Sequence, residues 1–553
     1  MAEIRKDLTN DAIEEAYALT DFDIQDSIEK RFEFRKQFIL KDVRLSKDEI
    51  SYAIKLLNKD FDDHKILSNE GIKRICENCK EKCLATFYCE FCVRNYLKNN
   101  FSNWTSENND IDNLIKKCQL ETITPQKIVE WIPYNNFQNL IRCLNKSGCS
   151  EIYTAYWIDG CYDEWDCKEK KLKRCGEQEV ILKKLENVKN AKKSWFDEGK
   201  INLLISNKWN DLVQCYGFTK DPKDGNYMLV LNKMDTNLRN YLLKYHTKLT
   251  WKERIQIAYE IINASCEIYD EKAIHKDLHS GNILYSQPRK KFCISDLGFC
   301  EPADKPLNSI YGKLPYIAPE VIVGKEITFA SNIYSIGILM WEISSGIQPF
   351  INYEHDSDLA MNIINGMRPK LVQGTPLEYG KLMEQCWNAD PKKRPDIYTL
   401  EDKLDVMRSN QNYQLNFTNI NNLPLNVNFG INPSLIKFLI KNSISRIYNF
   451  NDLPDPKNAT KEEQEAFHNM QNNLSILNDN NYETKGKSKR NNSYDSDVED
   501  NEINSKKLKV NHVKETNRVG FQYMQRSADD IDDTSDDDDD EVSILPILRQ
   551  EVS

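Results

Sequence analysis

The first 70 residues carry apolar side chains at intervals of three and four positions, the spacing of one face of an α-helix. The pattern runs through DAIEEAYALTDFDIQDSIEKRFEFRKQFIL and SKDEISYAIKLLNKDFDDHKIL, and neither stretch contains Pro or Gly. We therefore predict a helical N-terminal region over residues 1–70, arranged as a hairpin that packs on itself or on a neighbour.

The rest of the chain divides by composition into five further parts. A cysteine-rich patch over 71–100 leads into a polar connector over 101–136. Residues 137–407 have the density of Val, Ile, Leu and aromatic side chains that one large globular domain needs. An Asn-rich linker follows over 408–474. We expect the charged tail 475–553 to be disordered, because it cannot bury enough apolar surface to offset chain entropy.

Net charge is concentrated at one end of the chain. The 553 residues carry a net charge of −11, and the run DDIDDTSDDDDDE supplies nearly all of it. The folded part is close to neutral, which argues against a nucleic-acid partner. We see no secretory signal and no apolar run long enough to cross a bilayer, so we expect a cytoplasmic protein without a membrane partner. The basic clusters KGKSKR and KKLK suggest nuclear import as an alternative.

The cysteine-rich patch has the spacing of a metal site. Sixteen cysteines in a chain that is not exported should be reduced thiols. Cys76 and Cys79 form one C-x2-C pair and Cys89 and Cys92 form another, and two such pairs can close a tetrahedron around a structural zinc ion. Cys83 lies between the pairs and leaves the ligand set open. The alternative is a group of reduced, buried cysteines that act as small apolar side chains.

Several motifs in the globular part carry possible catalytic groups. HKDLHSGNIL places Asp277 and Asn282 five positions apart, and CISDLGF places Asp296 after an apolar, strand-like run. Upstream, Lys183 ends the β-prone run EQEVILKKL, and Glu198 lies on an expected helix in SWFDEGKINLL. YGKLPYIAPEV and SNIYSIGILMWEISSGIQPF follow downstream.

Together, in this order and at these distances, the motifs resemble the protein kinase family over roughly residues 137–407. The resemblance implies an α+β, bilobal protein kinase fold. The helical region and the small zinc module would precede this fold, and the disordered acidic tail would follow it. It also implies ATP and Mg²⁺ as cofactors and proteins as phosphate acceptors.

The resemblance assigns a role to each of five residues. Asp277 would accept or orient the proton of the substrate hydroxyl, and Asn282 would hold one Mg²⁺ ion. Asp296 would bridge the Mg²⁺ ions to the β- and γ-phosphates. Lys183 would bind the α- and β-phosphates, held in place by an ion pair with Glu198.

The resemblance also outlines a nucleotide pocket. Leu144 and Ile152 would line it beside the phosphate-covering loop, Leu231 falls at the gatekeeper position, and Met234 belongs to the hinge that would meet adenine. The family's glycines are replaced in that loop, at Asn145, Ser147 and Ser150. Side chains there crowd the backbone N–H groups over the phosphates, so we expect weakened nucleotide binding rather than its loss.

Supporting positions both follow and depart from the family's pattern. Glu320 and Arg394 occupy positions where the family forms a buried ion pair. Asn332 replaces an Asp that fastens the catalytic loop, which removes a charge but keeps an acceptor. Lys276 replaces an Arg and loses a bidentate fork. Ser309 and Tyr311 are candidate phosphorylation positions, the alternative being exposed hydroxyls without that role.

The leading hypothesis is an ATP- and Mg²⁺-dependent protein kinase directed at Ser and Thr, acting in intracellular signalling. The segment LHSGN is similar to the tyrosine-kinase-like group, and phrases such as CENCKEKCLATFYCEFCVRNYLKNNFSNWTS resemble kinase-like families of arbuscular mycorrhizal fungi. One alternative is a pseudokinase, a scaffold with weak or no phosphoryl transfer, suggested by the altered loop and Asn332. Another is a nuclear adaptor whose working parts are the zinc module and the acidic tail.

Overall fold

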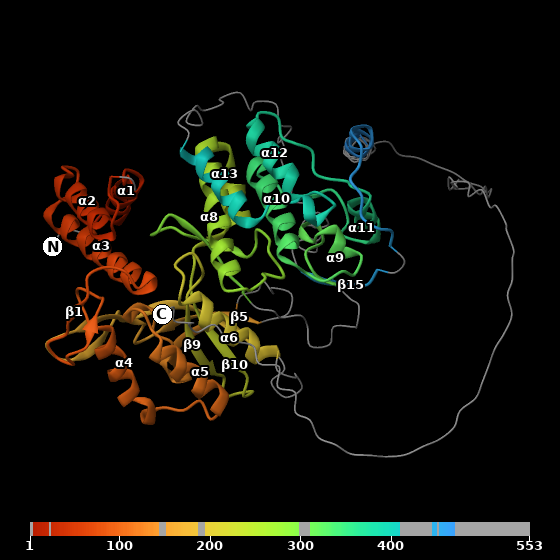
Figure 1. The fold of residues 1–553 in the computed structure, drawn as a ribbon. Coiled ribbons are helices and arrows are strands. Elements are labelled where there is room, and N and C mark those ends of the chain that lie inside the picture. Colours follow the sequence, from red (N-terminus) through yellow and green to blue (C-terminus); the bar gives the residue numbers. More distant parts are fainter. Residues whose placement is uncertain are drawn as a thin grey trace, which may run out of the picture. The chain divides into compact units, whose positions relative to one another are not determined.

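The computed structural model describes residues 4–21, 24–142, 151–185, 194–297, 310–409, 445–450 and 453–469. Within these ranges the protein mixes helices and sheets, as the predicted α+β class requires (Figure 1). No described helix combines the length and the apolar character needed to cross a bilayer.

The N-terminal region contains three helices: α1 (Lys6–Ala18), α2 (Ile28–Lys41) and α3 (Lys47–Ser68). The apolar pattern indicated two, because its first stretch continues through the break between α1 and α2 without a Pro or Gly. Ala12, Ile39 and Leu57 of the three helices meet in one cluster. A capping box starts α3, where the Glu49 N–H donates to the Ser46 hydroxyl at 3.3 Å and the Ser46 N–H donates to the Glu49 carboxylate at 2.8 Å.

Short elements follow the three helices. They are β1 (Arg74–Ile75), β2 (Lys82–Cys83), α4 (Glu90–Asn99), the 3-10 turns Phe101–Asn103, Pro125–Lys127 and Tyr134–Asn136, α5 (Asn109–Leu120) and β3 (Glu130–Trp131). β1 and β2 pair with each other, and β3 joins a larger sheet. The predicted connector 101–136 therefore contributes a strand to the sheet of the domain that follows it.

That sheet has six strands in the order β3-β9-β10-β8-β5-β4. Its other members are β4 (Phe137–Arg142), β5 (Ile152–Trp157), β8 (Gln178–Lys184), β9 (Cys215–Lys220) and β10 (Tyr227–Asn232). All described pairs are antiparallel except β3 with β9. Gly217, at φ +142°, makes the parallel pair possible, because a Cβ atom there would overlap the Glu130 backbone.

Two helices cover one face of this sheet. Ile111 and Ile115 of α5 and Leu203 of α6 (Ser194–Ser206) pack against Phe218 and Leu229 of the strands. A second apolar cluster, which includes Trp157, Leu182 and Val230, contains the strand residues that alternate with the first set. Between β5 and β8 the chain inserts a separate hairpin of β6 (Tyr162–Asp166) and β7 (Lys171–Arg174).

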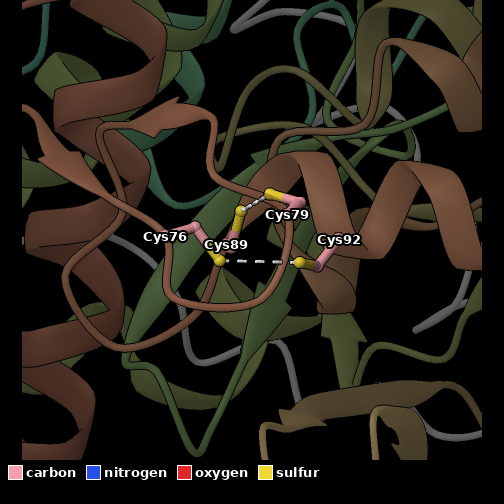
Figure 2. A group of neighbouring side chains, drawn as sticks. All are labelled: Cys76, Cys79, Cys89 and Cys92. Atoms are coloured by element: carbon pink, nitrogen blue, oxygen red, sulfur yellow. Dashed lines mark hydrogen bonds between the residues drawn. The ribbon is translucent and has the colours of Figure 1, made fainter.

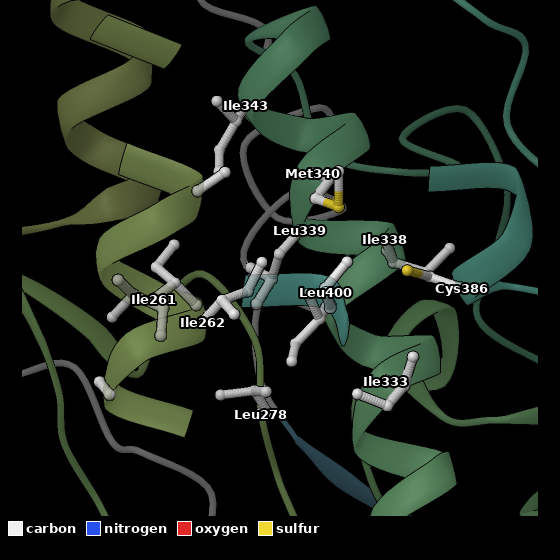
Figure 3. Packing of buried hydrophobic residues seen from close by; sticks show 14 of the residues in the cluster. Ile261, Ile262, Leu278, Ile333, Ile338, Leu339, Met340, Ile343, Cys386 and Leu400 are labelled. Atoms are coloured by element: carbon white, nitrogen blue, oxygen red, sulfur yellow. The ribbon is translucent and has the colours of Figure 1, made fainter. Parts of the chain in front are cut away.

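The second half of the domain is mainly helical. Its helices are α7 (Leu238–Tyr245), α8 (Trp251–Asp270), α9 (Pro319–Ile322), α10 (Phe329–Ser345), α11 (Ser357–Ile364), α12 (Leu377–Cys386) and α13 (Ile397–Ser409), with 3-10 turns at His246–Lys248, Leu314–Tyr316 and Pro391–Lys393. Ile262 of α8, Leu339 of α10 and Leu400 of α13 are buried in its core (Figure 3). Beside this core lies a sheet of β11 (Thr236–Asn237), β12 (Ile283–Ser286) and β13 (Lys291–Ile294).

One further strand pair joins distant parts of the chain. β14 (Ile310–Gly312) pairs antiparallel with β15 (Arg446–Tyr448), which comes from the stretch that the sequence assigned to a linker. Tyr448 is buried against Leu314 and Phe350 of the helical half. Residues 445–450 and 453–469 therefore belong to the packed structure.

Candidate active site

The loop between α8 and β12 holds Asp277 and Asn282, the pair that the sequence singled out. Nδ2 of Asn282 donates to the backbone carbonyl of Asp277 at 2.9 Å, which fixes the loop between the two residues. Because the amide nitrogen is used in this way, the Oδ1 atom of Asn282 remains on the other side of the group for a cation. Asp277 is half-buried and Asn282 is buried.

A histidine for which the sequence predicts no role faces the Asp277 carboxylate. The Gly281 N–H donates to Nδ1 of His279 at 2.9 Å, which leaves the proton of the neutral ring on Nε2. Nε2 lies 3.5 Å from Oδ2 of Asp277. Burial and the nearby Lys313 charge lower the pKa of His279 to about 4, so the ring is neutral at pH 7. The sequence signal that could have indicated this role is the position of His279, two residues after Asp277 in the same loop.

The Asp277 carboxylate is ionised at neutral pH. Burial acts to raise its pKa, but His279, a hydrogen bond from Ser445 and the Lys313 charge outweigh burial and lower the pKa to about 2. The Ser445 hydroxyl donates to Oδ2 of Asp277 at 2.7 Å. An ionised carboxylate within hydrogen-bonding reach of a hydroxyl can act as its proton acceptor.

Lys183 and Asp296 come together from two different sheets. Lys183 is on β8, its side chain is only 8% exposed, and its ammonium group forms an ion pair with Oδ1 of Asp296. Asp296 follows β13 and has φ +61°, an uncommon backbone conformation for a residue other than glycine. The left-handed backbone at Asp296 and the buried Lys183 together place a carboxylate that follows β13 beside a cation on β8, an interior strand of the six-stranded sheet.

The structure places only part of the predicted nucleotide pocket. Ile152 on β5 is the direct cross-strand partner of Lys183, and Leu231 on β10 is opposite Ile181 of the same β8 strand. Met234 follows β10, and its sulfur accepts from Nδ2 of Asn232 at 3.6 Å. Strands β5 and β10 thus bring Ile152 and Leu231 beside the strand that carries Lys183, and Met234 lies two residues beyond the end of β10.

Several predicted positions lie outside the described residues. They are Leu144, Asn145, Ser147, Ser150, Ser309, the side chain of Glu198 and the tail 475–553. The backbone of Glu198 belongs to α6, as the predicted helix requires. Tyr311 is described and is half-buried on β14, opposite Ile447 of β15.

Asn332 supports the catalytic loop in a way that an Asp could not. It lies on α10 against the backbone of His275, and with its amide turned to satisfy both groups it donates to the carbonyl at 2.8 Å and accepts from the N–H at 3.1 Å. His275 in turn bonds through Nε2 to the Ser295 carbonyl at 2.9 Å, next to Asp296. Asn332 therefore remains hydrogen-bonded to the backbone of the catalytic loop, although it lacks the charge of the Asp that the family has at this position.

The predicted ion pair of Glu320 and Arg394 is confirmed. Both guanidinium Nη atoms of Arg394 reach the two Glu320 carboxylate oxygens at 2.7 Å, and the two side chains are 0% and 6% exposed. Arg394 also donates to the carbonyl groups of Asn388 at 2.9 Å and Ala330 at 2.7 Å. This buried, bidentate pair joins α9 to the segment before α13.

The four cysteines of the two C-x2-C pairs converge on one point (Figure 2). All four sulfur atoms lie within 4.8 Å of one another, with Cys76 and Cys92 at 3.7 Å and Cys79 and Cys89 at 3.5 Å. The first pair lies in the turn between β1 and β2, and the second pair lies at the start of α4. The thiol of Cys83 is instead directed at the Arg74 carbonyl at 3.6 Å, outside this group of four.

Backbone groups already favour a thiolate at this cluster. Burial acts to raise the pKa of Cys76, but N–H groups of Cys79 and Asn78 outweigh it and lower the pKa to about 6. Burial raises the pKa of Cys92 to about 11, although Nδ2 of Asn78 donates to its sulfur at 3.3 Å. Trp165 of the inserted β6–β7 hairpin packs against the cysteines and so joins them to the six-stranded domain.

Comparison with known proteins identifies the domain. Residues 142–404 match the family described as protein tyrosine and serine/threonine kinase, and Lys183, Asp277, Asn282 and Asp296 all fall within the match. The chain contains a protein kinase domain. The match lies inside the predicted range 137–407, so the resemblance to the kinase family is confirmed at this level.

Relatives of the kinase domain come from animals and from an amoeba. A dual serine/threonine and tyrosine protein kinase of Takifugu rubripes is 30% identical over 222 residues, which is 36% of this chain and 24% of that protein. The Xenopus laevis protein of the same name is 31% identical over 194 residues, 34% of this chain and 21% of that protein. A protein of Dictyostelium discoideum named as a probable LIM domain-containing serine/threonine-protein kinase is 29% identical over 205 residues, 36% of this chain and 31% of that protein. The chain thus spans about a quarter of the length of the vertebrate relatives.

Proposed function

We propose that this chain is an ATP-dependent protein kinase that transfers the γ-phosphate of ATP to serine and threonine hydroxyls of proteins. The observation that carries the proposal is the ionised Asp277 carboxylate, which lies 2.7 Å from a serine hydroxyl and is fixed by Asn282 in the same loop. The named relatives support serine and threonine as acceptors, and the LHSGN segment supports the tyrosine-kinase-like grouping.

Each of the four described catalytic-site residues has a part in the transfer. The acceptor hydroxyl donates to Asp277, which holds its oxygen toward the γ-phosphate and takes the proton as the new bond forms. Lys183, with its buried ammonium group, binds phosphate oxygens, and Asp296 beside it keeps it aligned in the free protein. Asn282 and Asp296 present an amide oxygen and a carboxylate, the oxygen ligands that Mg²⁺ prefers. When bound, Mg²⁺ neutralises the charge of the phosphates.

The scaffold alternative now rests on a single feature. Asn332 makes both of its hydrogen bonds to His275, so it gives no reason to expect a weakened loop. The glycine replacements in the phosphate-covering loop remain, and they act on nucleotide affinity rather than on the groups that perform the transfer. We therefore expect the glycine replacements to raise the KM for ATP and to leave the rate of phosphoryl transfer from bound ATP unchanged.

The nucleotide end of the site is tested by two variants of the full-length protein. Lys183→Met removes the cation and Asp296→Asn removes the carboxylate charge, and both should bind ATP and Mg²⁺ more weakly than the wild type in a calorimetric titration. Asp402→Asn, an exposed position on α13, is the matched control. Equal binding by all four proteins would remove Lys183 and Asp296 from the proposed site.

We further propose that Cys76, Cys79, Cys89 and Cys92 hold one structural zinc ion. Sulfur atoms that lie 2.3 Å from a tetrahedral zinc ion are about 3.8 Å apart from one another. The sulfur atoms of Cys76 and Cys92 are 3.7 Å apart and those of Cys79 and Cys89 are 3.5 Å apart, close to this value. Cys89→Ser should lose zinc in elemental analysis of the purified protein, while Cys83→Ser should keep it. Wild-type protein without zinc, or equal loss in both variants, would contradict the assignment.

A further inference from the structure

A segment after the kinase domain lies where a protein substrate would have to be. Strand β15 pairs antiparallel with β14, in the register Ile310 with Tyr448, Tyr311 with Ile447 and Gly312 with Arg446. Ser445 immediately precedes β15 and is 8% exposed. The main-chain pairing of an extended segment with a strand edge is a common way for proteins to bind peptides, because it fixes the peptide's register.

The register brings a serine hydroxyl to the catalytic carboxylate. Oγ of Ser445 donates to Oδ2 of Asp277 at 2.7 Å, and the same oxygen lies 3.3 Å from Nε2 of His279. Since the ring proton of His279 is on Nε2, the imidazole can donate to Oγ while Oγ donates to Asp277. The hydroxyl is thus oriented with its proton on the base, the arrangement that general-base catalysis requires.

We propose that Ser445 is a phosphate acceptor of the chain's own kinase domain, and that residues 445–450 and 453–469 hold it in the substrate position. The inference rests on the kinase activity proposed above. In the step, Oγ of Ser445 attacks the γ-phosphorus of ATP, and the bond from that phosphorus to the β,γ-bridging oxygen breaks. The hydroxyl proton passes to Asp277, and ADP leaves with the bridging oxygen.

Apolar contacts hold the acceptor segment in register. Tyr448 is 7% exposed, stacks on Phe450 with ring centroids 5.6 Å apart, and packs with Leu314 and Ile322 of the helical half. Because side chains alternate along a strand, burial of Tyr448 fixes which residues of β15 face the kinase domain. A shift by one residue would expose Tyr448 and move Ser445 away from Asp277.

Residues 453–469 anchor the segment to the helical half at a second place. The Ala389 N–H donates to Oδ1 of Asn458 at 2.8 Å, and the Lys457 N–H donates to the Ile364 carbonyl at 3.0 Å. In the helical stretch 461–469, Oε1 of Gln464 accepts from the Arg368 N–H at 3.3 Å.

A glycine on the kinase domain makes this approach possible. Gly366 has φ +95°, and a Cβ atom there would overlap the backbone at Ala459. The domain thus has a surface fitted to this part of the chain.

The arrangement predicts both a modification and its consequence. While the Ser445 hydroxyl is bound to the Asp277 carboxylate, another protein cannot place its own hydroxyl there. The unmodified segment therefore competes with added substrates. Tethering gives it a high effective concentration in that competition. Phosphate on Ser445 adds negative charge beside the Asp277 carboxylate, and like charges at this distance repel, so the modified segment leaves the site.

The test uses the full-length protein, first treated with a phosphatase and then incubated with ATP and Mg²⁺. Phosphopeptide mapping should find phosphate on Ser445, at a rate per molecule that does not change when the protein is diluted. Ser445→Ala should lose this phosphopeptide, while Ser443→Ala, two positions earlier, should keep the phosphate on Ser445. A rate proportional to protein concentration would show transfer between molecules and overturn the intramolecular proposal.

A second pair of variants tests the anchor without touching the acceptor or the catalytic groups. Gln464→Ala removes a half-buried side chain that anchors the segment, and Glu465→Ala changes the exposed neighbouring position. Gln464→Ala also removes the bond that Nε2 of Gln464 donates to the Gly366 carbonyl. The variant should therefore slow phosphorylation of Ser445 roughly five- to hundredfold, the worth of two hydrogen bonds, and should speed phosphorylation of added dephosphorylated casein. Glu465→Ala should match the wild type in both rates.

The outcomes separate the two proposals. Phosphate on casein without phosphate on Ser445 would overturn the inference and leave the kinase proposal standing. Absence of transfer to both acceptors would overturn the kinase proposal and the inference with it. Phosphate on Ser445 that is unaffected by Gln464→Ala would show that residues 453–469 do not hold the acceptor.

Discussion

Replacing Glu320 by Gln tests whether the helical half of the kinase domain depends on its buried ion pair. The substitution keeps the size of the side chain and one acceptor oxygen but removes the charge opposite Arg394, whose side chain is fully buried. Arg394 remains in place, because its bonds to the Asn388 and Ala330 carbonyls are unchanged. The variant therefore keeps a buried cation without its counter-charge.

The magnitude follows from this geometry. Removing one partner of a buried ion pair typically costs about 3–5 kcal/mol, because the other charge stays desolvated. For a domain of this size, that loss corresponds to a decrease in Tm of roughly 6–20 °C. Asp405→Asn breaks an exposed pair in which the Asp405 side chain is 47% and the Arg408 side chain 38% exposed. It serves as the control, with an expected cost below about 1 kcal/mol.

Urea unfolding followed by tryptophan fluorescence measures both variants. Trp251, Trp341 and Trp387 all belong to the core of the helical half, so their emission reports on this part of the protein. The Glu320→Gln midpoint should fall far below the midpoints of the wild type and the control. A Glu320→Gln midpoint equal to that of Asp405→Asn would refute the reasoning, because the buried charge would then cost nothing.

Three further predictions concern the sheet, the nucleotide and pH. Gly217→Ala should lower the free energy of unfolding by at least about 3 kcal/mol, because a φ that disfavours alanine costs about 1–3 kcal/mol and the Cβ atom would also overlap the β3 backbone. A Tm equal to that of the wild type would contradict the β3–β9 pairing. Lys183→Met should raise the KM for ATP and lower kcat, measured by steady-state kinetics with an ATP series, and unchanged kinetics would exclude Lys183 from phosphate binding. His279 has a folded pKa of about 4 against 6.5 for the free side chain, so between these values the unfolded chain binds more protons. The contribution of His279 to stability is thus present above pH 6.5 and is lost as pH falls toward 4. On acidification the Tm of His279→Gln should therefore fall less than the Tm of the wild type. Parallel curves of Tm against pH for the two proteins would contradict this prediction.

The parts of the site that the sequence predicts are those whose chemistry is local. Asp277 and Asn282 share one short loop, and Cys76 and Cys79 share one tight turn, so spacing alone shows that they can act together. Cys83 shows where prediction from spacing ends, because spacing alone does not tell which four of the five cysteines would bind one zinc ion. In the structure the Cys83 sulfur lies within 4.8 Å of the Cys89 sulfur, but it is directed at the Arg74 carbonyl and does not belong to the group of four sulfur atoms that all lie within 4.8 Å of one another.

The parts that the sequence did not show depend on contacts between distant residues. Ser445 and Asp277 are 168 positions apart, and β15 follows an Asn-rich stretch that the sequence assigned to a linker, although the residues around β15, SLIKFLIKNSISRIYNF, are rich in apolar side chains. Its burial comes from a surface that the helical half provides around Leu314. The parallel strand β3 was hidden for a similar reason, since two residues are too few for a periodic pattern.

The most direct test of the central claim is phosphate transfer by the wild type and Asp277→Asn under single-turnover conditions, with ATP binding verified for both. The full-length proteins receive ATP labelled in the γ-phosphate, Mg²⁺ and dephosphorylated casein, and label in protein is followed with time. We predict transfer by the wild type and a rate lower by about 10²–10⁴-fold in Asp277→Asn, with ATP affinity unchanged. Equal rates in the two proteins, or ATP binding without any transfer by the wild type, would contradict the assignment of Asp277 as the catalytic base.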